Sequence, residues 1–233
     1  MHELPALTLA GGDGTLFHLL CRLPFPWPPV VLVPQGRGNA LGRDVGAGNR
    51  ARVDALRVTA FRPSGETAQC YSLSSVGLGY PSQVTRRAIP LRFLRRLSYA
   101  AAALFTLPSW SGFEISCGDG PPRAVRLRGV LVNNTRFTGG FEALPRASSR
   151  DGVAELLELT AGWFRQLAHN LSVITGLHCY EPARVTAVRR CRITPERPME
   201  LMIDGELLGA VSSVEMDVIP AALDIRIARP GLP

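Results

Sequence analysis

The sequence predicts a chain of two parts, a short α/β unit followed by a larger antiparallel β-sandwich. Three observations predict this arrangement. Two glycine-rich turns, Gly11–Thr15 and Gly36–Asn39, each stand between an apolar run and a segment with helical character. From Arg57 onward, apolar and polar residues alternate with the period of two that half-buried strands show. Of the 233 residues, 46% are apolar, which is enough for a sizeable core.

The α/β unit comprises residues 1–56 and alternates between strands and helices. Its expected elements are the strand Leu7–Ala10, the helix Thr15–Arg22, the strand Val30–Val33 and the helix Asn39–Asp44. Two strands and two helices do not close a parallel sheet and bury little surface by themselves. We therefore expect either that upstream strands are missing or that another surface covers the exposed edge of Leu7–Ala10.

Residues 57–233 form the predicted sandwich, whose last strand is expected to return to the first unit. The clearest alternating strands are Met199–Ile203, Val214–Val218 and Leu223–Ile227. Two stretches with helical character, Leu91–Leu107 and Trp163–Thr175, interrupt the strands.

The charge of the chain comes from arginine alone. All 26 basic residues are arginine, and the sequence contains no lysine. This excludes a P-loop lysine, a Schiff-base lysine and a lysine general base. The net charge of +7 predicts anionic partners, such as a nucleotide or an anionic membrane surface.

Cysteine usage and hydropathy indicate the compartment. The five cysteines are scattered without a C-x-x-C pair, which argues against a zinc site or a disulfide framework. The longest apolar run, Tyr99–Leu107, is far shorter than the roughly 20 residues of a bilayer span. We expect a cytoplasmic protein, which can still rest on the inner membrane surface.

The first glycine-rich turn reads Gly11-Gly12-Asp13-Gly14-Thr15. Glycines let backbone N–H groups approach a phosphate, and the helix that follows favours negative charge at its N-terminus. An aspartate beside phosphates makes sense if it holds a divalent cation or accepts a proton from the attacking hydroxyl. The alternative is an ordinary turn between a strand and a helix.

The second turn, Gly36-Arg37-Gly38-Asn39, again lies between an apolar strand and a helix. One Gly-x-Gly is weak evidence, but two such turns on adjacent parallel strands would meet at the same edge of the sheet. The pair therefore predicts a partial Rossmann-like nucleotide-binding unit.

These motifs resemble a known family. GGDGT followed by P-x-G-x-G-N is similar to the catalytic domain of diacylglycerol kinases, sphingosine kinases and their bacterial lipid-kinase relatives. The resemblance continues in order through Ser75–Gly79, Gly139-Gly140-Phe141, Pro145–Gly152 and Ile203–Glu206. Together these motifs cover nearly the whole chain.

The resemblance implies an enzyme that moves the γ-phosphoryl group of ATP to a lipid hydroxyl at a membrane surface, with Mg²⁺ and without nucleic acid. The implied ATP-binding residues are Gly11, Gly12, Asp13, Gly14, Thr15, Gly36, Arg37, Gly38 and Asn39. The implied catalytic residues are Asp13, Asp204 and Glu206, one of the last two acting as general base. The implied second metal site consists of Asp151 with the backbone carbonyls of Ser148 and Val153.

The chain also departs from the family pattern. Arg37 stands where Ser or Thr is expected, so its guanidinium either binds phosphate or fills the site. The family's first strands and their Asn-Pro-x-x-Gly phosphate loop are absent, so we expect an N-terminally shortened relative that forms a homodimer or is weakly stable. Two alternatives stay open: a catalytically impaired relative that binds nucleotide or lipid, and an NAD kinase-like enzyme.

Five arginines are interleaved with leucines around the first helical stretch. They are Arg86, Arg87, Arg92, Arg95 and Arg96. A basic amphipathic segment of this kind predicts either contact with an anionic bilayer or an ordinary solvated helix.

Overall fold

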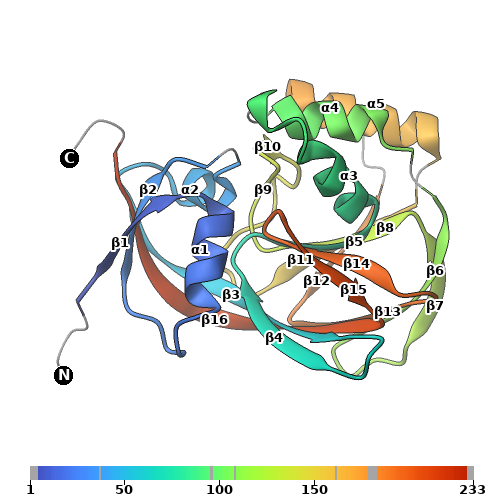
Figure 1. The fold of residues 1–233 in the computed structure, drawn as a ribbon, viewed down its shortest axis with the longest axis horizontal. Coiled ribbons are helices and arrows are strands. Elements are labelled where there is room, and N and C mark those ends of the chain that lie inside the picture. The colour runs from blue at the N-terminus through green and yellow to red at the C-terminus, as the bar shows by residue number, and fades with distance from the viewer. Residues whose placement is uncertain are drawn as a thin grey trace.

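The computed structural model describes residues 5–36, 38–94, 97–107, 109–160, 162–177 and 183–229. It confirms the predicted fold class, an α/β unit at one end of the molecule and a two-sheet sandwich at the other (Figure 1). The helices are α1 (Asp13–Leu20), α2 (Ala40–Val45), α3 (Tyr80–Ala88), the single 3-10 turn η1 (Arg92–Leu94), α4 (Leu97–Phe105) and α5 (Trp163–Thr175).

The strands form two large sheets and one short hairpin. The first sheet contains β1 (Leu7–Gly11), β2 (Val30–Pro34), β3 (Arg50–Phe61), β4 (Thr67–Ser72), β6 (Ser111–Cys117), β7 (Arg123–Leu127), β13 (Arg190–Pro195) and β16 (Ser213–Ile227). The second contains β5 (Ser75–Gly79), β8 (Gly129–Asn133), β11 (Ala154–Leu159), β12 (Ala183–Val188), β14 (Met199–Ile203) and β15 (Glu206–Val211). The hairpin consists of β9 (Phe137–Thr138) and β10 (Phe141–Glu142).

In the α/β unit, β1 and β2 run parallel and β2 pairs in parallel with the last part of β16. Side chains at alternate positions point to one face, where α1 and α2 cover them. The resulting core contains Leu16, Leu20, Leu32, Leu41, Val53, Leu223 and Ile225. Helices thus cover one face of this small sheet, and β1 is its edge strand among the described residues.

Two long strands join the units. Both β3 and β16 run from the sandwich into the α/β unit, so the expected boundary after residue 56 falls inside β3. The pairing shifts between Ile219 and Leu223, where Ala221 has a φ of 50°. The buried carboxylate of Asp54 on β3 fixes this irregularity by accepting a hydrogen bond of 2.7 Å from the N–H of Ala221.

The sandwich core lies between the two sheets, because the period-two alternation predicted from Arg57 onward directs apolar side chains inward. Its buried members include Leu56, Val58, Val76, Ile115, Leu156, Ile193, Leu201, Ile203, Val214 and Met216. Helices α3, α4 and α5 lie together on the far side of the second sheet, at the top of Figure 1.

The expected single helix Leu91–Leu107 is wrong, and the expected helix Trp163–Thr175 is confirmed as α5. Pro90 follows the C-cap residue Ile89 of α3, and a proline lacks the N–H that continues a helix. The chain therefore ends α3, makes the turn η1 and begins α4 at Leu97. Gly176, with a φ of 73°, ends α5 in the left-handed conformation that favours glycine.

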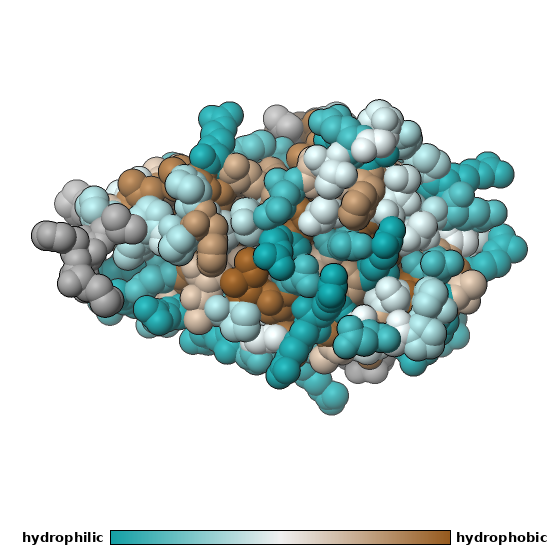
Figure 2. All heavy atoms as spheres, turned by 90° about the horizontal axis from the view of Figure 1, so that it is seen from below, coloured by the Kyte–Doolittle hydropathy of each residue, from teal (hydrophilic) through white to brown (hydrophobic). Residues whose placement is uncertain are grey.

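The first sheet carries cross-strand ion pairs between β3, β13 and β16. Arg57 and Arg190 contact the carboxylate of Asp217 at 3.4 and 3.3 Å, respectively. Figure 2 shows the molecule from below, a face dominated by hydrophilic side chains with smaller apolar patches.

Within the described residues, no helix combines the length and apolar character that a membrane span needs.

Candidate active site

The two glycine-rich turns contact each other directly. The N–H of Gln35 donates to the carbonyl of Gly11 at 2.8 Å. A Cβ added to Gly12 would lie 2.6 Å from the Cα of Gly36, closer than real Cβ contacts come. Glycine is therefore required here so that the turns can approach, as the parallel pairing of β1 with β2 predicts.

Asp13 connects the first turn to the start of α2. Its carboxylate accepts hydrogen bonds from the N–H groups of Ala40 at 2.8 Å and Leu41 at 3.2 Å. It therefore supplies the negative charge that a helix N-terminus favours, in place of a cap from the helix's own sequence. Burial raises the pKa of the Asp13 carboxyl, against the effect of these hydrogen bonds. A role toward Mg²⁺ or an attacking hydroxyl stays a prediction.

Asn39 lies between the two turns. Its Nδ2 donates to the carbonyl of Gly36 at 2.8 Å, and its Oδ1 is buried without a described partner. Gly38 lies across from the second unit, since an added Cβ would be 3.5 Å from the N of Gly140. Arg37 lies outside the described residues.

The hydrogen bonds of the Asp204 carboxylate hold two segments of the protein together. It accepts hydrogen bonds from the hydroxyl of Ser72 at 2.7 Å and from the N–H groups of Leu73, Ser74 and Ser75 at 2.9, 3.0 and 2.8 Å. Burial is the main cause that raises its pKa to about 6, with the hydrogen bonds opposing. Asp204 thus fastens the loop between β4 and β5 to the turn after β14, and it has little capacity left to act as a base.

Glu206 lies at the meeting point of the two units. A Cβ added to Gly14 would be 2.6 Å from its Oε1, so its carboxylate stands directly against the first glycine turn. Its Oε2 is 3.9 Å from Nε2 of His18, and the side chain is 44% exposed. Glu206 is therefore the predicted catalytic carboxylate with the more accessible oxygens.

Sequence reasoning did not include His18 in the site. Its position four residues after Gly14 on α1 places both on one face of the helix, which is the signal that could have found it.

One continuous cavity of about 330 Å³ begins at this meeting point. Its polar end is formed by Gly12, Asp13, Gly14, Thr15, Gly36, Gly38, Asp204 and Glu206. It continues beneath the helical layer α3–α5, where its walls are mainly apolar. These walls include Val84, Ala100, Ala103, Leu131, Phe141, Leu157, Leu159, Val173, Ile174 and Met202.

Tyr99 of α4 stands where the two ends of the cavity meet. A Cβ added to Gly139 would lie 3.1 Å from its ring, and one added to Gly205 would lie 2.9 Å from its hydroxyl oxygen. Both glycines have a positive φ. The Gly-Gly-Phe and Asp-Gly-Glu motifs named in the sequence thus converge on one aromatic side chain.

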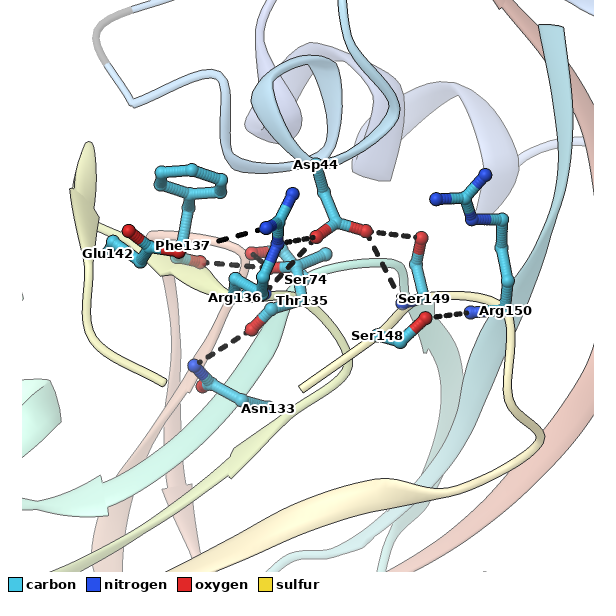
Figure 3. Close-up of polar contacts among 10 residues, drawn as sticks. All are labelled: Asp44, Ser74, Asn133, Thr135, Arg136, Phe137, Glu142, Ser148, Ser149 and Arg150. Carbon is cyan, nitrogen blue, oxygen red and sulfur yellow. Dashed lines mark hydrogen bonds and ion pairs between the residues drawn. The ribbon is translucent and has the colours of Figure 1, made fainter. Parts of the chain in front are cut away.

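Asp44 anchors α2 to the sandwich (Figure 3). Its buried carboxylate accepts hydrogen bonds from Nε of Arg136 at 3.2 Å and from the hydroxyl of Ser149 at 2.6 Å. Arg136 also faces Glu142 at 3.8 Å and lies over the ring of Phe137. These contacts fix the second glycine turn, through α2, relative to the two loops of the sandwich.

The residues expected at the second metal site lie away from this cavity. Asp151 lines a separate surface hollow, and its Oδ1 accepts a hydrogen bond of 3.2 Å from the N–H of Val153. The hydroxyl of Ser148 accepts one from the N–H of Arg150 at 3.3 Å. No group of three or more histidine, cysteine or acidic side chains suited to a metal occurs among the described residues. This metal site stays a prediction.

Comparison with known proteins gives one family match. The family described as the YegS C-terminal NAD kinase beta sandwich-like domain matches residues 74–227. No curated protein matches the chain.

Two solved structures illustrate the fold. A diacylglycerol kinase from Bacillus anthracis str. Sterne has a TM-score of 0.75 and 18% identity, over 97% of this chain and 78% of that one. The yeast NADH kinase complexed with NADH has a TM-score of 0.54 and 12% identity, over 96% of this chain and 61% of that one. At these identities the likeness shows the fold alone.

Proposed function

Because the chain belongs to the family of the YegS C-terminal NAD kinase beta sandwich-like domain, among the diacylglycerol kinase-like lipid kinases, we propose that it transfers a phosphoryl group from ATP to a lipid hydroxyl. One observation carries the proposal. A single cavity joins two glycine turns and the carboxylate of Glu206 to a mainly apolar compartment under α3–α5.

The apolar compartment supports a lipid acceptor. Its walls are mainly aliphatic and aromatic side chains from the second sheet and from three helices, with a few polar side chains on α3 and α5. Such walls stabilise a hydrocarbon chain by removing it from water, at roughly 25 cal/mol per Å² of apolar surface. A nicotinamide dinucleotide is polar along its length and gains little from this surface, so the compartment favours a lipid over NAD.

The polar end fits a nucleotide. When bound, ATP supplies the phosphoryl group and Mg²⁺ the charge neutralisation that such a transfer needs. The N-terminus of α1, with Gly12 as its cap residue, has no side-chain cap, so its N–H groups are available to phosphate oxygens. The N-terminus of α2 is already satisfied by Asp13. We therefore assign phosphate binding to the N–H groups of Gly11–Thr15.

Glu206 accepts the proton of the lipid hydroxyl. It stands at the junction of the two ends of the cavity, and the imidazole of His18 lies 3.9 Å from its Oε2. Asp204 holds the turn that presents Glu206, and is a positioning residue. Tyr99, which contacts the same turn, closes the junction from the side of α4.

The acceptor class can be tested with the purified chain. We expect incorporation of labelled phosphate from ATP-Mg²⁺ into diacylglycerol or monoacylglycerol in mixed micelles, and none into NAD. Phosphorylation of NAD and of no lipid would identify an NAD kinase-like enzyme. Binding of lipid without any phosphate transfer would identify a catalytically impaired relative.

A further inference from the structure

A network of hydrogen-bonded side chains lies in the wall of the mainly apolar compartment. The hydroxyl of Tyr80 on α3 donates to the carbonyl of Ala103 on α4 at 2.7 Å. Nδ2 of Asn170 on α5 donates to the same hydroxyl at 2.7 Å and to the same carbonyl at 3.0 Å. Nε2 of Gln166, one turn earlier on α5, donates to Oδ1 of Asn170 at 3.1 Å. All three helices are tied together by these bonds.

The order of donors and acceptors in this network follows from the carbonyl of Ala103, at which it ends. The carbonyl of Ala103 can only accept, so the amide group of Asn170 that faces it must be the donor Nδ2. Oδ1 of Asn170 then faces Gln166, which must present its own donor Nε2. Because burial raises the pKa of Tyr80 to about 12, its hydroxyl stays protonated and remains a donor at neutral pH.

The last member of this hydrogen-bonded network, Gln166, belongs to the cavity wall and carries a buried acceptor. Gln166 is 3% exposed, lines the cavity, and its Oε1 is buried without a described partner. A buried carbonyl oxygen without a donor costs free energy, whereas the same oxygen paired with a ligand donor contributes to binding. The same cavity wall also contains apolar side chains of α5, Val173 and Ile174, together with His169.

We propose that this compartment selects lipids whose hydrocarbon chain carries a hydrogen-bond donor, either a hydroxyl or an amide N–H. Oε1 of Gln166 accepts the hydrogen bond from this donor. The inference rests on the proposed lipid acceptor and names its class. A site built to bond a polar group discriminates strongly against the analogue that lacks it, because its own buried group is then left unpaired. Gln166 thereby sets specificity without taking part in the transfer.

The test is a lipid-binding titration without nucleotide. It compares oleoylglycerol with ricinoleoylglycerol, which has one added hydroxyl, and with isomers in which the hydroxyl is moved along the chain. We expect at least one hydroxylated lipid to bind the wild-type chain about tenfold more tightly than oleoylglycerol, since one added hydrogen bond to a buried acceptor has roughly that effect. Gln166→Leu should abolish this preference and bind oleoylglycerol at least as well.

Two further variants keep the result interpretable. Gln69→Leu removes an exposed glutamine on β4, outside the cavity, and should leave the preference unchanged. Gln166→Met retains an unbranched side chain of similar length and should behave as Gln166→Leu does, with cooperative unfolding showing that both variants fold.

The outcomes separate this inference from the proposed function. Equal binding of all lipids by the wild-type chain, or a preference that survives in Gln166→Leu, would overturn the role of Gln166 while leaving lipid phosphorylation intact. A hydroxyl preference that depends on Gln166, in a chain that phosphorylates no lipid, would support the inference and contradict the kinase proposal.

Discussion

Asp204 and Glu206 are two residues apart, yet their environments differ in a way that the sequence could not reveal. The Asp-Gly-Glu motif predicted two carboxylates at one site, and both do line the cavity. The donors to Asp204 come from Ser72–Ser75, about 130 residues earlier in the sequence, and no local pattern predicts that they meet this carboxylate. Only the tertiary structure shows that one carboxylate holds the fold and the other stays accessible.

The buried carboxyl of Asp204 makes stability depend on pH. Its pKa is raised from 3.8 to about 6, so the Asp204 carboxyl group binds its proton more tightly in the native protein than in the unfolded chain. Its contribution to the free energy of unfolding is therefore complete below about pH 4 and decreases as the pH rises through about 6, by on the order of 2–3 kcal/mol.

Urea unfolding of the wild-type chain and of Asp204→Asn between about pH 4 and pH 7 measures this effect. The variant should be less stable throughout, because an amide cannot accept from all four donors. The difference in the free energy of unfolding between the wild-type chain and Asp204→Asn should decrease as the pH rises. A difference that stays constant or grows would show that Asp204 is ionised in the native protein throughout.

At the scale of elements, the predictions succeeded where one local signal determines the structure. Alternation in Met199–Ile203 gives β14, and the helical stretch that ends before Gly176 gives α5. The helix α3 was not predicted, because Tyr80–Ala88 contains no leucine or isoleucine and so lacks a clear apolar stripe. It forms because its buried residues Tyr80, Ser82 and Thr85 pack against neighbouring elements.

The start of α2 should depend on Asp13. Asp13→Asn replaces one of two acceptor oxygens by a donor that faces an N–H group, so we expect a loss of about 1 kcal/mol in the free energy of unfolding, as for other helix caps. Phosphate transfer should fall as well, since Gly38 and Asn39 lie in the same connection. Asp119→Asn, in the exposed turn after β6, is the control. It should change neither the free energy of unfolding nor the phosphate transfer. An unaltered unfolding midpoint for Asp13→Asn would show that α2 needs no cap.

The helical layer carries exposed aromatic side chains that suit a membrane surface. Phe93, Phe105 and Phe164 are 77%, 74% and 78% exposed, on η1, α4 and α5 above the apolar compartment. Of the arginines expected to contact lipid, Arg86 pairs with Glu200 at 2.6 Å, and Arg87 donates to the carbonyl of Phe105 at 2.8 Å. Arg95 and Arg96 lie outside the described residues, and the side chain of Arg92 is not described.

We expect the three phenylalanines to bring the cavity to its lipid. Replacing all three by serine should weaken binding to phosphatidylglycerol vesicles about tenfold, measured by co-sedimentation, because each ring loses apolar contact with the bilayer. The wild-type binding should also weaken with added salt, as expected of a chain with a net charge of +7. Val185→Ser, an exposed apolar position on β12, is the control. Unchanged vesicle binding of the triple variant would assign these rings another role.

At the scale of the whole molecule, β3 and β16 make one sheet of what the sequence divides into two units. The sequence could predict the two parts, because glycine turns and period-two alternation are local. It also led to the expectation that the last strand returns to the first unit. Which residues of β16 pair with β2 and which with β13 could not be predicted, because register between distant strands depends on packing. The cavity, which needs both units, was foreseen only through the family resemblance.

The edge strand β1 should promote self-association. It pairs with β2 alone among the described residues, and Thr8 and Ala10 on it are exposed. Such an edge pairs readily with another chain, and a charged side chain opposes this. Sedimentation should show dimers or larger species that decrease in Thr8→Lys, whereas Ser64→Lys in the exposed turn after β3 should have no effect. A wild-type chain that stays monomeric at high concentration would contradict this expectation.

The central claim is that Glu206 serves the transfer of phosphate to a lipid at the junction of the two units. The most direct measurement is the rate of phosphate transfer from ATP-Mg²⁺ to diacylglycerol by the wild-type chain, by Glu206→Gln and by Glu66→Gln, which changes an exposed glutamate outside the cavity. The account predicts that Glu206→Gln lowers kcat by about 100-fold or more, as expected for loss of a general base, with unchanged thermal unfolding, while Glu66→Gln matches the wild type. A folded Glu206→Gln protein with the kcat of the wild type would contradict it.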